Sequence, residues 1–213
     1  MTESEVRDIE RRTRRYFYDD GFVEIAVGLL FLLLGGYFYA SVALPAASSV
    51  KSWLDASLVV VIAAGVFLVG RLVRFLKQRV TYPRTGYVAY KKTAATPGRR
   101  LGAALSGGVI AVALAAFFTV SPSGKAWLPA VNGVLLALAC HLFARRSDVG
   151  RFHILATASA IIGLGVALAG FGDIKGVSLY YAAFGVAVIV SGLAAFSLYL
   201  RRSRSEAEGG HGR

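Results

Sequence analysis

The chain has 213 residues, of which 56% are hydrophobic and only 17% are charged. Soluble domains carry more charge, so this composition excludes an ordinary soluble protein and favours one that spans a membrane. The formal net charge of +12 is concentrated in particular connecting segments and not along one face, which argues against nucleic-acid binding. A single cysteine, Cys140, excludes an intramolecular disulfide.

Residues 1–20 are densely charged and predict a short cytoplasmic amphipathic helix ahead of the membrane. Glu3 stands four positions before Arg7, an order that favours a helix. Val6 and Ile9 fall on one face, so this helix could lie in the lipid headgroup region, and a solvated tail is the alternative. The charged start also predicts a retained first span and no cleaved signal peptide.

Six apolar stretches follow, each close to the ~20 residues that a helix needs to cross ~30 Å of hydrocarbon. Because the bilayer core holds no water, segments of this length can satisfy their backbone polar groups only as helices. The sequence therefore predicts an all-α, polytopic integral membrane protein with a six-helix transmembrane domain over residues 21–200. The spans are expected near residues 21–43, 54–76, 101–121, 126–144, 152–171 and 177–200.

Lysine and arginine are distributed unequally among the connections. Five precede the first span, nine lie between residues 71 and 100, three lie between 145 and 151, and four follow residue 200. The other three connections hold one each, Lys51, Lys125 and Lys175. Since cytoplasmic loops carry the excess of Lys and Arg, we expect both termini and the loop 77–100 in the cytoplasm, with the protein in a bacterial-type plasma (inner) membrane.

Tyrosines and tryptophans cluster where the expected spans meet the two membrane surfaces. Their amphipathic rings favour that depth, so we expect an aromatic belt at each face. The outer belt would comprise Tyr37, Tyr39, Trp53, Trp127, Tyr180 and Tyr181, and the inner belt Tyr16, Tyr18 and Tyr199.

Small residues at i,i+4 spacing mark three of the spans. Such stripes let helix backbones approach closely in lipid, so we expect the third, fifth and sixth spans inside the bundle or at a homodimer interface. The first span, with its leucine-rich run 29–34, is expected to face lipid. The stripes are Gly107, Ala111 and Ala115, then Ser159, Gly163 and Ala167, and finally Ala187, Ser191 and Ala195.

The loop 77–100 contains turn chemistry between tyrosines. Pro83 and Gly86 suit a short turn, flanked by Val80 and Tyr82 before it and by Tyr87 after it. This pattern predicts a small β-hairpin at the membrane surface, although topology-setting charge alone also explains the basic residues of the loop. The residues expected to contact anionic lipid or a partner protein are Tyr82, Arg84, Tyr87, Lys91 and Lys92.

Four ionisable residues lie about one turn inside the cytoplasmic face. Glu24 of the first span and Arg71 of the second are expected at the same depth, and we hypothesise an ion pair between them. The alternative is that Arg71 extends to the headgroups while Glu24 stabilises a helix N-terminus. His141 and His153 share this depth on the fourth and fifth spans, but no Glu or Cys completes a ligand spacing, so we expect neither metal nor cofactor.

No catalytic constellation is present in the sequence, and near the midplane only hydroxyls such as those of Ser159 and Ser191 occur. We therefore expect a non-enzymatic membrane protein with a basic cytoplasmic face that contacts anionic lipid or a protein partner. The alternative is a small transporter or channel subunit. Residues 201–213 are polar and glycine-rich and predict a disordered cytoplasmic tail.

Overall fold

The computed structural model describes residue 18 and residues 20–45, 47–81, 122–171 and 173–209. This part of the chain is all-helical and contains no strand. Its helices are α2 (Phe22–Ala43), α3 (Ser49–Leu76) with a π-helical extension η1 (Lys77–Thr81), a 3-10 helix η2 (Pro122–Trp127), α6 (Leu128–Ser147), α7 (Arg151–Leu168) and α8 (Asp173–Gly209).

The helices α2, α3, α6, α7 and α8 are long and apolar enough to cross a membrane, which indicates a multi-pass membrane protein. They coincide with the first, second, fourth, fifth and sixth predicted spans. The third predicted span, 101–121, lies outside the described residues. So does the predicted N-terminal helix, apart from Tyr18 and Asp20.

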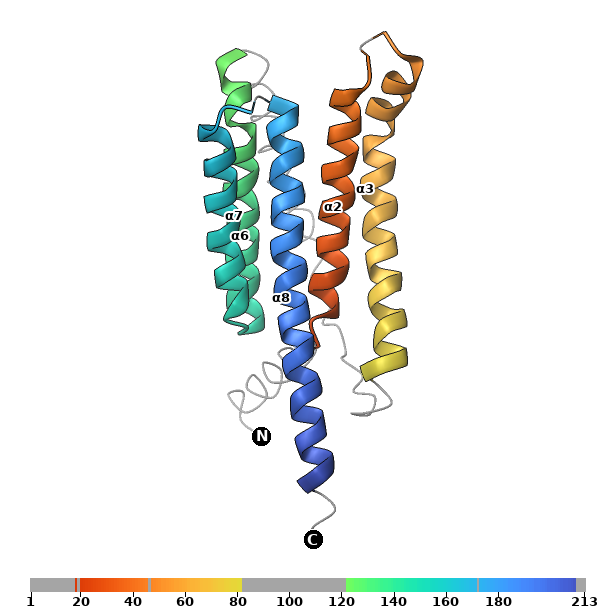
Figure 1. The fold of residues 1–213 in the computed structure, drawn as a ribbon, viewed down its shortest axis with the longest axis vertical. Coiled ribbons are helices and arrows are strands. Elements are labelled where there is room, and N and C mark those ends of the chain that lie inside the picture. Colours follow the sequence, from red (N-terminus) through yellow and green to blue (C-terminus); the bar gives the residue numbers. More distant parts are fainter. Residues whose placement is uncertain (1–17, 19, 46, 82–121, 172, 210–213) are drawn as a thin grey trace, which may run out of the picture.

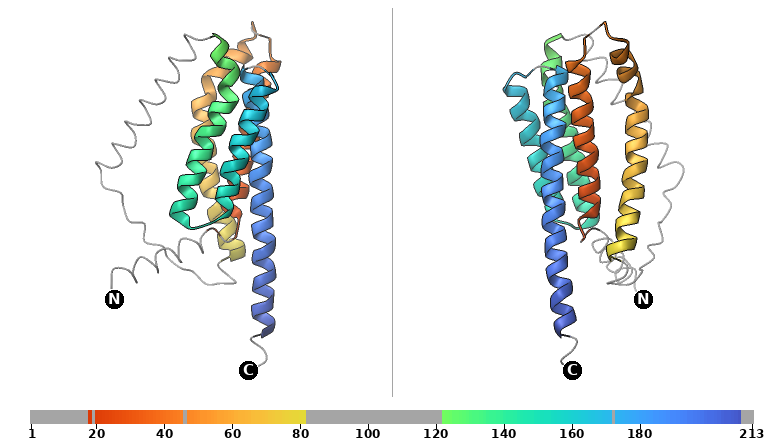
Figure 2. Two further views of the ribbon diagram at one scale, coloured as in Figure 1. Left: turned by 90° about the vertical axis from the view of Figure 1, so that its left-hand side faces the viewer. Right: turned by 45° about the vertical axis from the view of Figure 1, so that its right-hand side comes forward.

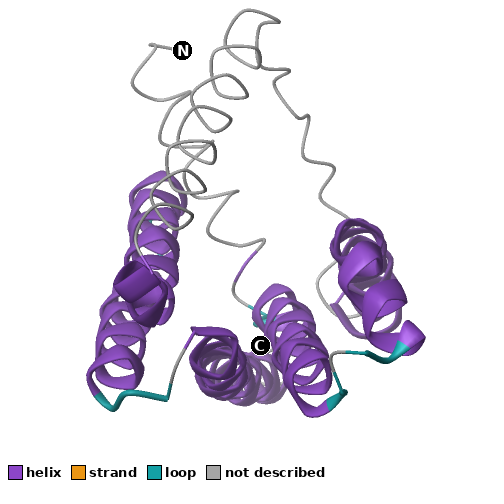
Figure 3. Cartoon of the chain, turned by 90° about the horizontal axis from the view of Figure 1, so that it is seen from above, coloured by secondary structure: helices purple, strands orange, loops and turns teal. Residues whose placement is uncertain are grey.

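Helices α2 and α7 run in one direction along the bundle, and α3, α6 and α8 run in the other (Figure 1). Seen from above they form a bent row, with α6 and α7 at one side, then α8, then α2, and α3 at the other side (Figure 3). The most extensive contacts join α2 to α8 and α6 to α7. We call the end at which α2 begins and α3 and α6 finish the basic end, after its arginines Arg71, Arg74, Arg79, Arg145 and Arg146.

Glycines seven residues apart bring α2 and α8 into backbone contact. A Cβ atom on Gly28 would lie 2.8 Å from the Gly185 carbonyl oxygen, and one on Gly35 would lie 2.9 Å from the Ala182 nitrogen. In lipid, small residues permit such close approach, and a seven-residue spacing keeps them on one seam. The small residues face one another in antiparallel pairs, Gly21 with Gly192, Gly28 with Gly185 and Gly35 with Ser178.

The expectation that the first span faces lipid is therefore wrong, because α2 packs between α8 and α3. The glycines of this seam are seven residues apart, so they form no i,i+4 stripe. On α8 the closest backbone contacts are made by Gly185 and Gly192, while the expected stripe residues Ala187 and Ser191 are only half-buried. Ala195, the third member of that stripe, is buried.

The second predicted stripe is confirmed at its centre, where α6 crosses α7. A Cβ atom on Gly163 would lie 2.6 Å from the Pro129 carbonyl oxygen and 2.8 Å from the Gly133 Cα atom. Ser159 is fully buried beside this crossing. These small residues are used for packing within one chain. The stripe expected on the third span, Gly107 to Ala115, lies outside the described residues.

Two segments are helical where the sequence predicted otherwise. The helix of α3 and η1 continues to Thr81, so Val80 is not part of a strand, and the rest of the expected hairpin lies outside the described part of the chain. Helix α8 runs to Gly209, beyond the other helices (Figure 2), through residues expected to be disordered. Extending an existing helix costs little compared with starting one, which explains the continuation.

Candidate functional site

An ion pair between a half-buried arginine and a buried carboxylate joins α2 to α7 at the basic end. The Nε of Arg151 donates to Oε1 of Glu24 at 2.5 Å, and Glu24 is only 3% exposed. The Arg151 guanidinium also donates to the Tyr18 carbonyl oxygen, which lies just before α2. Arg151 is the first residue of α7, so this contact fixes the start of one helix against the start of another.

The expected ion pair between Glu24 and Arg71 is not formed, because Glu24 is bonded to Arg151. Successive residues of a helix are ~100° apart, so Glu24 and Ala26, which are two positions apart, point to nearly opposite sides of α2. Ala26 is on the side that faces α3 and Arg71. Ala26 and Arg71 both line a groove between α2 and α3. Glu24 lies instead one turn from Gly28, on the side of α2 that faces α8.

A second ion pair joins α2 to the end of α3. The Lys77 Nζ lies 2.9 Å from Oδ2 of Asp20, and both side chains are almost completely buried. Asp20 also accepts a hydrogen bond from the Phe22 backbone nitrogen at 3.3 Å, at the N-terminus of α2, where a negative charge is favourable. Asp20 and Glu24 thus bind cations from two different neighbouring helices.

Sequence reasoning missed the pair of Asp20 and Lys77, since it placed Asp20 in a cytoplasmic helix and Lys77 in a loop. The pair could have been predicted from the antiparallel arrangement of two consecutive spans. Residues just before the first span and just after the second lie at the same end of the bundle. Charges this deeply buried stabilise a fold only when they are paired, and loss of one partner is costly. The second oxygen of Glu24, Oε2, has no hydrogen-bond partner in the described part of the chain.

The two histidines of the expected polar layer do come together. His141 of α6 and His153 of α7 place their Nδ1 atoms 3.2 Å apart, beside the turn that joins these helices. Both side chains are exposed. No third metal-ligating residue lies near them among the described residues. One imidazole can donate to the other, so the two Nδ1 atoms satisfy each other.

A polar cluster lies between α6, α7 and α8. Ser159 donates to the Gly133 carbonyl oxygen at 2.9 Å and lies 2.7 Å from the Tyr180 hydroxyl. The Tyr181 hydroxyl donates to Oδ1 of Asn132 at 2.9 Å. The prediction that Tyr180 belongs to the outer aromatic belt is wrong, because its ring is fully buried and its hydroxyl is bonded inside the bundle. Three other residues of the predicted outer belt are exposed near the end opposite the basic end, as a belt requires: Tyr39, Trp53 and Trp127.

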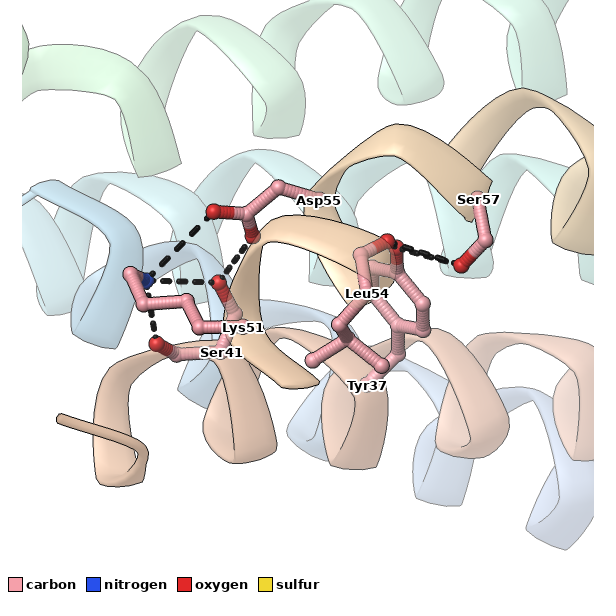
Figure 4. Close-up of polar contacts among 6 residues, drawn as sticks. All are labelled: Tyr37, Ser41, Lys51, Leu54, Asp55 and Ser57. Carbon is pink, nitrogen blue, oxygen red and sulfur yellow. Dashed lines mark hydrogen bonds and ion pairs between the residues drawn. The ribbon is translucent and has the colours of Figure 1, made fainter. Parts of the chain in front are cut away.

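Polar contacts also join α2 to α3 at the end opposite the basic end (Figure 4). Ser41 donates to Oδ1 of Asp55 at 2.6 Å, and the Lys51 ammonium donates to the Ser41 carbonyl oxygen at 2.6 Å. Lys51 also lies 3.5 Å from Asp55. One turn further in, the Tyr37 hydroxyl donates to the Leu54 carbonyl oxygen. Polar contacts therefore hold α2 and α3 together at both ends of this hairpin.

The five residues expected to contact lipid or a partner, Tyr82, Arg84, Tyr87, Lys91 and Lys92, lie outside the described residues. The described site therefore consists of the ion pairs of Asp20 and Glu24, the exposed arginines of the basic end and the groove beside Arg71. The chain matches no protein-family model, no curated protein and no solved structure.

Proposed function

We propose that this protein is a non-enzymatic, multi-pass protein of a bacterial-type plasma membrane whose basic end binds anionic lipid headgroups at the cytoplasmic surface. The observation that carries this proposal is the grouping of exposed arginines at one end of the bundle. Arg74, Arg79, Arg145 and Arg146 are all exposed there, from two different hairpins. The cations Lys77 and Arg151 are neutralised by buried acids, so the exposed ones supply the net charge.

The opposite end differs in charge. Its lysines are Lys51, Lys125 and Lys175, and Lys51 is paired with Asp55. Asp173 also lies at that end, at the start of α8. This asymmetry supports an orientation with the basic end in the cytoplasm, where the anionic leaflet attracts Lys and Arg.

Neutralising the basic end is expected to abolish a preference for anionic lipid. Each exposed cation contributes about 1 kcal/mol near an anionic surface, so changing Arg79, Arg145 and Arg146 to Gln should weaken binding roughly a hundredfold. Native mass spectrometry of the protein purified from equimolar phosphatidylglycerol and phosphatidylcholine measures the retained lipids. The matched control changes Lys125 and Lys175 to Gln at the opposite end and should leave the preference intact.

An unchanged preference in the arginine variant would contradict the proposal. A separate variant with Arg84, Lys91 and Lys92 changed to Gln measures the share of the loop 77–100. If only this loop variant loses the preference, recognition resides in the loop and not in the arginines of the helix ends.

The orientation has its own test. A reporter enzyme that is active only outside the cytoplasm is expected to be inactive when inserted after Gly86 and active when inserted after Ser48, between α2 and α3. Activity is measured in intact cells, with both insertions checked for expression. The reverse pattern would place the basic end outside and remove the attraction to the anionic inner leaflet.

A small transporter or channel subunit is the second candidate. It is favoured by a cavity of about 210 Å³ between α2, α6 and α8, which Asn132 and Tyr181 line. However, Asn132 lies only four residues after Leu128, the first residue of α6, and therefore close to one membrane surface. Its Oδ1 already accepts from Tyr181, and its Nδ2 donates to the Leu128 carbonyl oxygen. The lipid-binding proposal therefore has the stronger support.

A further inference from the structure

An apolar groove of about 420 Å³ runs between α2 and α3. Its volume falls within the ~300–1,000 Å³ of ligand-sized pockets. Leu33, Leu68 and Phe75, which line it, are each about half exposed, so the groove opens on the outside of the bundle. It lies between the pair of Asp20 and Lys77 at one end of the hairpin and the contacts of Ser41 at the other.

One charged residue, Arg71, lines the groove. Arg71 is exposed, and among the described residues it has no carboxylate within ion-pair distance. The acid that shares its depth, Glu24, is bonded to Arg151 on the other side of α2. A guanidinium inside a membrane requires an anion or access to the headgroups, and its planar donors match a phosphate.

The groove is long enough to extend through one leaflet. Its lining on α3 begins at Gly65 and ends at Phe75. Ten residues of helix rise ~15 Å, which is half of the ~30 Å hydrocarbon thickness. Arg71 lies near the basic end of this lining, at the depth from which a long side chain can reach the headgroup region.

We propose that the groove binds one glycerophospholipid of the leaflet at the basic end, with an acyl chain along α2 and α3 and the phosphodiester on Arg71. The apolar lining holds the chain, and Arg71, the charged residue of that lining, supplies the charge that the phosphodiester requires. This inference rests on the proposed membrane location. It adds a defined site that takes any phosphodiester lipid, whereas the exposed arginines select anionic headgroups.

Two matched pairs of variants test the site. In R71Q, retention of both phosphatidylglycerol and phosphatidylcholine should fall roughly fivefold. R74Q is the control. Arg74 lies on the same helix and is one of the exposed arginines of the basic end, but it does not line the groove and donates to the Gly70 carbonyl oxygen. R74Q should therefore lower only the retention of phosphatidylglycerol and leave that of phosphatidylcholine unchanged. V69W should fill the groove and displace the lipid with Arg71 intact. V66W is its control, because Val66 is exposed and does not line the groove.

Retained lipid is counted by native mass spectrometry after stepwise delipidation, and thermal unfolding confirms that each variant is folded. A diacylglycerol with the same chains but no phosphate should not replace the lost lipid. Unchanged retention in both R71Q and V69W would overturn the groove site while leaving the proposed function in place. Conversely, an unchanged phosphatidylglycerol preference in the Arg79, Arg145 and Arg146 variant would overturn the proposed function and not the groove.

Other occupants would also overturn this inference and are detected by cross-linking. With Cys140 changed to Ser, a cysteine at Leu68 that forms a disulfide-linked dimer would assign the groove to a second copy of the chain. A disulfide between that cysteine and one introduced within residues 101–121 would assign it to the apolar segment of the same chain. The lipid site predicts neither cross-link.

Discussion

Replacing Gly35 by leucine is expected to separate α2 from α8 and to destabilise the protein by about 3 kcal/mol or more. The added Cβ would meet backbone atoms, at 2.9 Å from the Ala182 nitrogen and 3.1 Å from the Ser178 oxygen. Backbone cannot move aside as a flexible side chain can, so the helices must part. The hydrogen bond from Ser178 to the Gly35 carbonyl oxygen, now 2.8 Å long, would also be lost.

The neighbouring glycine provides the control. Gly36 is exposed, and a Cβ atom there would meet nothing within 4 Å. Gly36→Leu is expected to be neutral or mildly stabilising, because leucine is the better helix former. Thermal unfolding in detergent, followed by circular dichroism, measures both variants. Equal stability of the two variants would show that α2 and α8 do not meet along the glycine seam.

Breaking the pair of Glu24 and Arg151 is expected to have the second large effect. Arg151→Met leaves a carboxylate buried without its cation, a change that typically costs ~3–5 kcal/mol. It also removes the donor to the Tyr18 carbonyl oxygen. Glu24→Gln should cost less, since the amide oxygen can still accept from Arg151. The double variant should be more stable than the two separate losses together imply, by ~1 kcal/mol or more.

The control cycle pairs Glu24→Gln with Arg71→Gln. Arg71 lies in the groove on the other side of α2, so these two changes are expected to add within ~0.5 kcal/mol. Unfolding free energies from denaturant titration provide all the terms. Coupling in the Arg71 cycle, with additivity in the Arg151 cycle, would mean that α2 is rotated about its axis relative to the arrangement described.

Properties that depend on composition along the chain were predictable from the sequence. The apolar lengths of α2, α3, α6, α7 and α8 each exceed or approach what a bilayer requires, whichever neighbours they have. The proximity of His141 and His153 was also predictable. The helices that carry them are joined by a short turn around Asp148, which necessarily places both rings at one depth.

The partner of Glu24 was not predictable from its depth in the membrane, because Arg71, Arg151 and Lys77 are all expected near that depth. Which cation it meets depends on how α2 is rotated about its axis. That rotation is set by Gly28 and Gly35, whose missing side chains let α8 approach on one side. Tyr180 shows the same limit, since its position in the chain suits a membrane surface while its packing buries it completely.

By itself, the sequence determined an all-helical membrane protein with strongly unequal basic charge between its connections. These features follow from hydrophobicity and charge summed over whole segments, which no packing arrangement alters. The tertiary structure alone decided that α2 packs between α8 and α3, that Asp20 and Glu24 bind Lys77 and Arg151, and that Arg71 is left at an apolar groove. Those outcomes depend on helix rotation and on contacts of a few ångströms between residues distant in the chain, which hydropathy does not encode.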